Sequence, residues 1–168
     1  MPRILVASDA DWIKDEIQGA LLSPGTEVTT VDRGRDVVPA VREQAPDVVI
    51  LDLQIGNMGA AAVCRDLRNE EEAGRMPRRT PVVFLLDRRP DVFLARRADA
   101  DAWLEKPISP RALQRTLDAL LAGETWSPET VAPAQPDEEA PLLTEGSAAE
   151  GVTGDSEAIR AGSPTTSD

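Results

Sequence analysis

The chain has 168 residues, of which 41% are hydrophobic, so one cored domain with an appendage is expected. Residues 1–123 carry a net charge of −3 and residues 124–168 carry −9, which argues against direct nucleic-acid binding, because phosphate contacts require a basic surface. The chain has a single cysteine, Cys64, which excludes an intrachain disulfide. It has no histidine, which removes the commonest general base and metal ligand. The first apolar run, Ile4–Ala7, is too short for a signal peptide or a membrane span, so we expect a soluble, cytoplasmic protein with no membrane association.

Five short runs of β-forming residues follow one another along the chain. The predicted strands are Arg3–Ser8, Glu27–Val31, Asp47–Leu51, Pro81–Leu86 and Ala102–Leu104. In the third and fourth runs, residues 48–51 and 82–86 are continuously apolar, which is typical of strands buried on both faces of a parallel sheet.

Between and after these runs, apolar residues recur at the spacing of one helix face. They are Ile13, Ile17, Ala20 and Leu21; Val37, Val41 and Ala45; Ala60, Val63, Cys64 and Leu67; and Leu113, Leu117, Leu120 and Leu121. A short helix is predicted within residues 90–98, and Ser109 followed by Pro110 is a favourable start for the last helix. Five strand–helix units indicate an α/β fold with a doubly wound, five-stranded parallel sheet and helices on both faces.

The pattern ends near residue 123. Residues 124–168 are rich in Pro, Glu, Ala, Ser, Thr and Gly, with Trp126 as the only aromatic residue and Leu142-Leu143 as the only aliphatic pair. Such a segment buries too little apolar surface to offset the entropy cost of ordering it. We therefore predict a folded domain over 1–123, a disordered acidic tail over 124–168, and no second folded domain.

The predicted sheet brings several polar residues to one edge, because sites in such sheets lie outside the carboxyl ends of the strands. The residues that follow the strands are Ser8, Asp9, Asp52, Asp87 and Lys106. Three carboxylates close together repel one another unless a cation intervenes, and a hard divalent ion with oxygen ligands is the natural candidate. Lys106 is placed to pair with these carboxylates or with an incoming phosphoryl group.

In order and spacing, four stretches resemble the receiver domain of two-component response regulators, over nearly all of residues 1–122. The stretches are Ile4–Asp9, Pro46–Leu53, Pro81–Leu86 and Ala102–Pro107. The resemblance implies a (βα)5 fold of the flavodoxin or receiver type. It also implies that Asp52 is the phosphoacceptor, phosphorylated by a histidine kinase.

The same resemblance implies roles for the residues around the phosphoacceptor. Asp9, Asp52 and the backbone carbonyl of Gln54 would hold Mg²⁺. Lys106 would contact the phosphoryl group, and the peptide bond that follows it would be cis. Trp103 would be the switch aromatic, which moves together with a hydroxyl residue after the fourth strand when the added charge arrives.

Four positions depart from the family pattern. Ser8 replaces the first member of the acidic pair, which removes a charge from the metal shell and should weaken Mg²⁺ binding. Asp87 occupies the position of the switch hydroxyl, where an ionised carboxylate would repel a phosphorylated Asp52. Arg88 stands where a small residue is usual, placed to screen the phosphoryl site or pair with it, and Gly56 stands where a proline is usual.

Two hypotheses remain open for Asp87. In the first, its carboxylate supplies the metal-shell charge that Ser8 lacks. In the second, it pairs with Lys106 and holds the switch in one state without phosphate.

The leading interpretation is a stand-alone response regulator of a phosphorelay, phosphorylated on Asp52. Its partners would be a sensor histidine kinase or other phosphodonor and a downstream protein, and it would have no enzymatic activity of its own. The alternative is a phosphorylation-independent pseudo-receiver, which Ser8, Asp87 and Arg88 favour. A phosphohydrolase of the haloacid-dehalogenase type is disfavoured because Gln54 stands where a second acid is needed, and a Rossmann domain because no glycine fingerprint follows the first strand.

A group of arginines within residues 88–97 has two interpretations. Arg88, Arg89, Arg96 and Arg97 form either a solvated face or a docking surface around the fourth helix. A further hypothesis is that the acidic tail docks transiently on this face and competes with partners.

Overall fold

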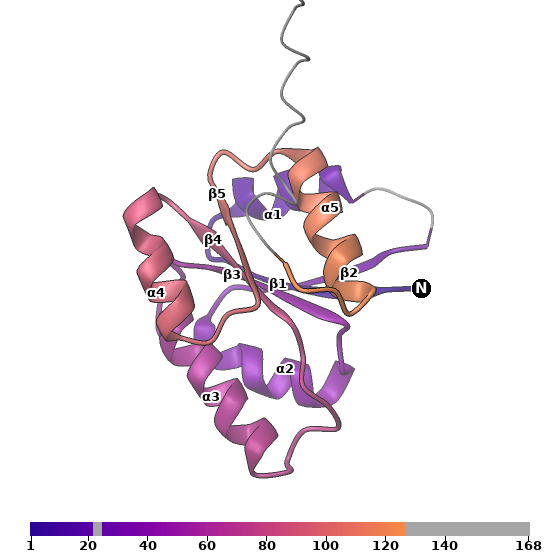
Figure 1. The fold of residues 1–168 in the computed structure, drawn as a ribbon, viewed down its shortest axis with the longest axis vertical. Coiled ribbons are helices and arrows are strands. Elements are labelled where there is room, and N and C mark those ends of the chain that lie inside the picture. Colours follow the sequence, from indigo (N-terminus) through magenta and orange to yellow (C-terminus); the bar gives the residue numbers. More distant parts are fainter. Residues whose placement is uncertain (22–24, 127–168) are drawn as a thin grey trace, which may run out of the picture. The chain divides into compact units, whose positions relative to one another are not determined.

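The computed structural model of the chain describes residues 1–21 and 25–126. Its centre is a five-stranded parallel sheet in the order β2-β1-β3-β4-β5 (Figure 1). The strands are β1 (Arg3–Ala7), β2 (Glu27–Val31), β3 (Val48–Asp52), β4 (Val82–Leu86) and β5 (Ala102–Glu105). Within a residue or two at each end they confirm the predicted strands, and the predicted fold class is confirmed with them.

The helices connect successive strands and cover both faces of the sheet (Figure 1). They are α1 (Asp11–Ala20), α2 (Val37–Gln44), α3 (Ala60–Glu72), α4 (Val92–Arg97) and α5 (Pro110–Leu121), with short 3₁₀ turns η1 (Gly34–Asp36) and η2 (Arg89–Asp91). Apolar residues of α1 and α5 share one buried cluster with the sheet, and those of α2, α3 and α4 share the other. The sheet is thus the middle of three layers, as its continuously apolar central strands require.

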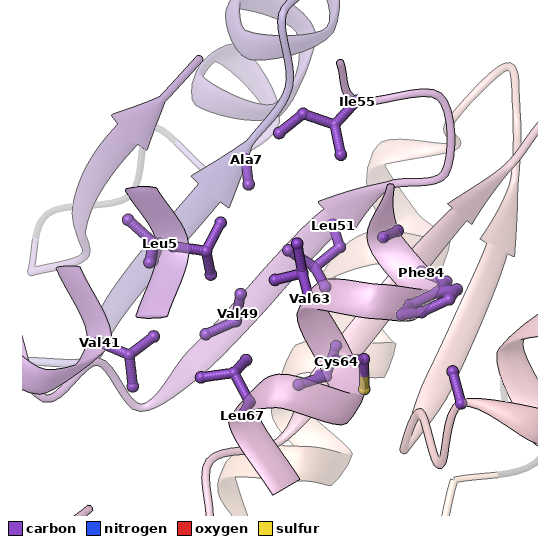
Figure 2. Close-up of a cluster of buried hydrophobic side chains, with 14 of the residues drawn as sticks. Leu5, Ala7, Val41, Val49, Leu51, Ile55, Val63, Cys64, Leu67 and Phe84 are labelled. Atoms are coloured by element: carbon purple, nitrogen blue, oxygen red, sulfur yellow. The ribbon is translucent and has the colours of Figure 1, made fainter. Parts of the chain in front are cut away.

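The cluster under α3 illustrates how the alternating faces of the strands are used (Figure 2). Leu5 of β1 and Val49 of β3 point towards the helices, and Val63 and Leu67 of α3 meet them. All four side chains are fully buried. Each such side chain contributes about 1.5–3 kcal/mol relative to exposure, so this packing fixes β1 and β3 beside each other in the middle of the sheet.

Two of the residues predicted on helix faces do not continue the buried part of those faces. Ala45 ends α2 as its C-cap in a left-handed conformation with φ of 46°, instead of continuing the helix face. Leu121 is the last residue of α5 and is 41% exposed, because the apolar stripe leaves the sheet at the end of the helix. The predicted start of α5 is confirmed, since Ser109 Oγ accepts a hydrogen bond from the backbone N–H of Ala112 at 3.4 Å and Pro110 follows it.

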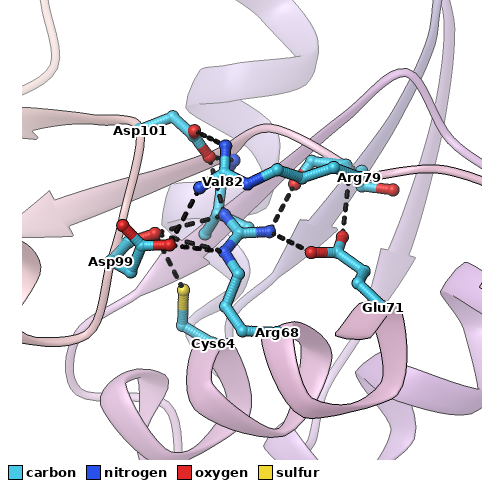
Figure 3. Close-up of polar contacts among 8 residues, drawn as sticks. Cys64, Arg68, Glu71, Arg79, Val82, Asp99 and Asp101 are labelled. Atoms are coloured by element: carbon cyan, nitrogen blue, oxygen red, sulfur yellow. Dashed lines mark hydrogen bonds and ion pairs between the residues drawn. The ribbon is translucent and has the colours of Figure 1, made fainter. Parts of the chain in front are cut away.

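A buried arginine ties the amino edge of β4 and β5 to α3, which the sequence did not indicate (Figure 3). Arg68 Nη2 lies 2.7 Å from Asp101 Oδ2, and its Nη1 lies 2.8 Å from Glu71 Oε2. The same guanidinium also donates to the backbone carbonyls of Thr80 and Asp99. Because burying a charge is tolerated only when it is paired and hydrogen-bonded, this network is a structural clamp at the edge opposite the strand ends that carry the candidate site.

The packed chain extends past residue 123, where the sequence placed the domain boundary. Trp126 is buried, its ring lies 4.4 Å from that of Trp103 in an edge-to-face contact, and its Nε1 donates to Thr116 Oγ1 at 3.1 Å. Trp126 therefore belongs with the domain rather than with the predicted tail. Residues 127–168, the remainder of that predicted tail, lie outside the described residues.

Across the described ranges, 1–21 and 25–126, no helix is both long enough and apolar enough to pass through a membrane.

Candidate functional site

Asp52 is the last residue of β3, and it is only 1% exposed at the carboxyl end of the sheet. The register places it opposite Leu85 of β4, so its carboxylate emerges between the ends of neighbouring strands. Its Oδ2 accepts a hydrogen bond from Ser8 Oγ at 2.8 Å. Its Oδ1 accepts from Lys106 Nζ at 2.7 Å and from the backbone N–H of Gln54 at 3.1 Å. A buried carboxylate is thus held at both oxygens.

Ser8 contributes a hydrogen bond to the site, a role that its lack of charge did not suggest. It is fully buried after β1, and its hydroxyl accepts from the backbone N–H of Ala10 at 3.1 Å while it donates to Asp52. An acid at this position would repel the Asp52 carboxylate unless a cation lay between them. Ser8 instead holds that carboxylate with a neutral hydrogen bond.

Lys106 links Asp52 to Asp87. Its Nζ lies 2.7 Å from Asp52 Oδ1 and 3.1 Å from Asp87 Oδ1. Burial opposes the charge on this ammonium, but the hydrogen bonds to Asp52 and Asp87 outweigh that effect and raise the pKa of Lys106 above its usual value. The peptide bond that follows Lys106 is cis, as the resemblance implied.

This contact bears on the two hypotheses for Asp87. Its carboxylate reaches the lysine, as the pairing hypothesis requires. Within the described part of the chain, no three His, Cys, Asp or Glu side chains are arranged as a group that could hold a metal ion. The 3.1 Å contact between Asp87 Oδ1 and Lys106 Nζ therefore agrees with the pairing hypothesis.

Asp9 is exposed and is fixed by the loop that follows Asp52. Its Oδ2 accepts from the backbone N–H of Gly56 at 3.1 Å. A proline at position 56 has no N–H to donate, and a Cβ there would lie 2.9 Å from the same oxygen. The glycine that departs from the family pattern therefore suits the position of Asp9.

The turn after β2 contacts the loop that follows Asp52. Gly34 donates its N–H to the carbonyl of Gly56 at 3.2 Å. A Cβ on Gly34 would lie 1.8 Å from the carbonyl oxygen of Met58, so only glycine permits this approach. The segment that carries Gln54 and Gly56 is thus fixed against the sheet.

The donor set matches the chemistry of a hard cation. Asp9 and Asp52 offer carboxylate oxygens and Gln54 offers a backbone carbonyl, and Mg²⁺ commonly uses one or two carboxylates with water for the rest of its shell. These residue types fit Mg²⁺, although the Ser8 hydroxyl already holds one oxygen of Asp52.

The two remaining residues singled out from the sequence, Trp103 and Arg88, contact other side chains. Trp103 on β5 is partly buried, with the guanidinium of Arg96 5.2 Å from its ring centre and Trp126 against it. Arg88 pairs with Asp91 at 3.3 Å, and its side chain is 76% exposed. The contact of Arg88 in the structure is with Asp91, and its role at the phosphoryl site stays a prediction.

Comparison with known proteins places the chain among signalling proteins. The model of the family described as response regulator receiver domain matches residues 4–118. The transcriptional regulatory protein AfsQ1 of Streptomyces coelicolor is 29% identical over 123 residues, which are 72% of this chain and 52% of that protein. Protein PilH of Pseudomonas aeruginosa is 28% identical over 123 residues, covering 73% of this chain and all of PilH. The DNA-binding response regulator MtrA of Mycobacterium tuberculosis is 31% identical over 121 residues, 71% of this chain and 50% of MtrA.

The chain therefore spans about half the length of AfsQ1 and MtrA and the full length of PilH. Among solved structures, the receiver domain of a signal transduction histidine kinase from Syntrophus aciditrophicus matches with a TM-score of 0.63 at 25% identity, covering 76% of this chain and 95% of that one. The receiver domain of the sensor histidine kinase PA1611 from Pseudomonas aeruginosa, described with a magnesium ion in its active site cleft, matches with a TM-score of 0.63 at 24% identity, covering 72% and 98%. From the family match and the agreement of fold, the chain belongs to the response regulator receiver domain family of two-component systems.

Proposed function

We propose that this receiver accepts a phosphoryl group on Asp52 and signals through contact with a downstream protein. The supporting observation is the buried carboxylate of Asp52 at the end of β3, held 2.7 Å from the ammonium of Lys106. The phosphoryl donor would be a sensor histidine kinase or a small phosphodonor in the cytoplasm. The chain contains no histidine, so a donor histidine would lie outside residues 1–168.

The proposed reaction is a transfer to a carboxylate oxygen. An oxygen of Asp52 attacks phosphorus and forms an O–P bond, while the bond from phosphorus to the donor breaks and its electron pair leaves with the donor. Lys106, already in contact with this carboxylate, would pair with the negatively charged phosphoryl oxygens. Asp9, Asp52 and the carbonyl of Gln54 would hold Mg²⁺, which when bound neutralises developing charge.

Two features should weaken the binding of Mg²⁺ and of a phosphoryl group at this site relative to the family pattern. The hydroxyl of Ser8 adds no charge to hold a cation, so the affinity for Mg²⁺ should be low. The carboxylate of Asp87 shares Lys106 with Asp52 and adds negative charge where a phosphoryl group would arrive. We therefore expect phosphorylation to be slow with small phosphodonors.

A second function, a phosphorylation-independent pseudo-receiver, is supported by one specific contact. Asp87 lies 3.1 Å from Lys106, and this ion pair supplies by itself a negative partner for the lysine. In that case the surface would bind its partner constitutively, with no covalent step at Asp52.

The deciding experiment is incubation of the full chain with acetyl phosphate and Mg²⁺, followed by intact-mass measurement, with Asp52→Asn as the matched control. A mass increase of one phosphoryl group in the wild type and none in Asp52→Asn supports phosphotransfer. If no adduct forms with acetyl phosphate, and beryllofluoride leaves the NMR spectrum of the folded protein unchanged, the pseudo-receiver is the correct assignment.

A further inference from the structure

The groove between α3 and α4 is an apolar surface with basic side chains in its wall. It encloses about 310 Å³ and is lined by Ala61, Ala62, Arg65, Leu94, Arg97 and Ala98. Beside it, Phe93 of α4 is 62% exposed, and Leu94 in its wall is 38% exposed. The volume lies near the lower end of ligand pockets, which span about 300–1,000 Å³, and therefore suits one large side chain. Exposed apolar surface with a polar rim is typical of an interaction site.

The groove carries positive charge that no acid neutralises. Its lining contains no carboxylate, and within residues 1–21 and 25–126 neither Arg65 nor Arg97 forms an ion pair. The guanidinium of Arg97 lies instead over the ring of Phe93, 5.8 Å from the ring centre. Guanidinium groups without acids attract a negatively charged ligand and stack well on an aromatic ring.

The neighbouring arginines of the same stretch behave differently. Arg88 pairs with Asp91 at 3.3 Å, and Arg89 pairs with Glu105 at 3.2 Å. The basic surface suggested by residues 88–97 is therefore divided, and its unneutralised part lies on α4 itself.

The outer side of α1 is complementary to this groove. Trp12 is 58% exposed there, although tryptophan is usually well buried. Asp15 and Glu16 follow it by three and four residues, so they share its side of the helix. Neither acid forms an ion pair in the described part of the chain, and Lys14 of the same helix is already paired with two other acids. This side of α1 thus combines an aromatic side chain with negative charge that no base neutralises.

The helix α1 cannot reach the groove of its own chain. It packs with α5 on one face of the sheet, whereas α3 and α4 pack on the other face (Figure 1). The whole thickness of the sheet separates the two surfaces. A second copy of the chain can present its α1 to the groove without this obstacle.

We propose that α1 of one copy docks in the groove between α3 and α4 of a second copy. Trp12 enters the groove, while Asp15 and Glu16 pair with Arg65 and Arg97 at its rim. Tryptophan and arginine are the residue types that most often dominate interface energetics. The proposal goes beyond the proposed phosphotransfer and does not depend on phosphorylation of Asp52.

The symmetry of this contact predicts the form of the assembly. The contact joins two different surfaces, so every docked copy still has one free surface of each kind at the ends of the assembly. Because these surfaces lie on opposite faces of the sheet, the same two copies cannot exchange both contacts. Association should therefore continue head to tail beyond the dimer, into an open row or a ring. Each copy carries a net charge of −12, so the copies repel one another and the association should be weak.

The test begins with sedimentation equilibrium of the full chain from about 10 µM to about 1 mM, the range in which weak contacts become populated. We expect the average mass of the wild type to rise with concentration and to pass that of two chains. A groove variant, Arg65→Glu with Arg97→Glu, should stay monomeric over the same range. Its matched control, Arg35→Glu with Arg111→Glu, reverses the same number of exposed arginines elsewhere and should associate.

A helix variant tests the other side of the contact. Trp12→Ser, combined with Asp15→Asn and Glu16→Gln, should also stay monomeric. These substitutions lower the net negative charge, so increased repulsion cannot explain a loss of association. Circular dichroism checks that each variant is folded, which is expected because Trp12 and the replaced arginines are exposed.

Mixing the two variants should restore one contact and no more. The groove variant keeps an intact α1, and the helix variant keeps an intact groove, so an equimolar mixture should form a 1:1 complex and nothing larger. With only the helix variant enriched in ¹⁵N, the amide signals of residues 61–65 and 94–98 should shift. With only the groove variant enriched, those of residues 12–19 should shift.

Four results would overturn the proposal. A wild type that stays monomeric up to about 1 mM would leave the groove to a different protein. A wild type that stops at the dimer would mean a contact between identical surfaces. Loss of association in the control as well as in the groove variant would assign the effect to net charge. Folded variants that form no complex when mixed would show that α1 and the groove are not each other's partners.

Discussion

Asp87 competes with Asp52 for the ammonium of Lys106, so we expect replacing it to strengthen the binding of a phosphoryl mimic. Asp87→Thr removes the charge and supplies the hydroxyl that the family pattern has at this position. Asp87→Asn removes the charge alone. Both changes leave Lys106 paired with Asp52 only.

The expected size of the effect follows from the contact itself. Opposite unit charges 3.1 Å apart attract by about 1.3 kcal/mol at the dielectric constant of water. The side chain of Asp87 is 37% exposed, so solvent screening keeps this pair at about 1 kcal/mol or less. Repulsion between Asp87 and the incoming negative group adds a comparable amount, and since about 1.4 kcal/mol changes an equilibrium tenfold, we expect roughly tenfold tighter binding.

The assay is a titration with beryllofluoride at saturating Mg²⁺, followed by NMR or by tryptophan fluorescence. Glu105→Gln is the matched control, because Glu105 precedes Lys106 and pairs with Arg89 at 3.2 Å without contacting the lysine. It removes one negative charge from the same region. If Asp87→Thr and Asp87→Asn bind beryllofluoride no more tightly than Glu105→Gln does, competition for Lys106 is not what limits this site.

Three further predictions concern stability. Trp126→Ala should lower the free energy of unfolding by about 2–3 kcal/mol and Trp126→Phe by about 1 kcal/mol, since the buried ring packs on Trp103 and donates a hydrogen bond to Thr116. Urea unfolding measures both changes. Losses below about 0.5 kcal/mol would argue against this packing. Arg68→Met should cost about 3–5 kcal/mol in the same assay, because it leaves the buried side chain of Glu71 without its cation and Asp101 with Arg79 alone, and a near-neutral result would mean that the network relaxes freely. Burial raises the pKa of the Cys64 thiol from 9.0 to about 11, so between these pH values the folded chain keeps a proton that the unfolded chain loses. The free energy of unfolding should therefore fall as the pH rises from 9.0 to about 11, and it should fall less steeply in Cys64→Ala.

The amino-acid sequence by itself determined the strands, their order as parallel strand–helix units, and the residues at the strand ends. Continuous apolar runs and helical periodicity are local signals. A strand buried on both faces of a sheet is apolar throughout, and a helix that packs on the sheet has apolar residues at helical spacing. Asp52, Asp9 and Lys106 were predicted as site residues for the same reason: each directly follows a recognisable strand. The cis bond after Lys106 came from the resemblance alone.

The contacts within the site were decided only by the tertiary structure. Ser8 had been read as a lost acid, and its hydrogen bond to Asp52 depends on two strands 44 residues apart being neighbours. The donation from Gly56 to Asp9 depends in the same way on a loop and a strand end that meet only in the fold.

A local sequence pattern also could not predict the burial of single residues such as Arg68 and Trp126. The residue type of Arg68 gives no sign of burial, because arginine is usually exposed, and its burial follows from carboxylates and carbonyls contributed by other elements. Trp126 stood in an acidic, proline-rich context, and its place against Trp103 follows from the position of β5 beside α5. Sequence patterns report the burial of segments, whereas the pairing of single polar groups is fixed by which segments the fold brings together.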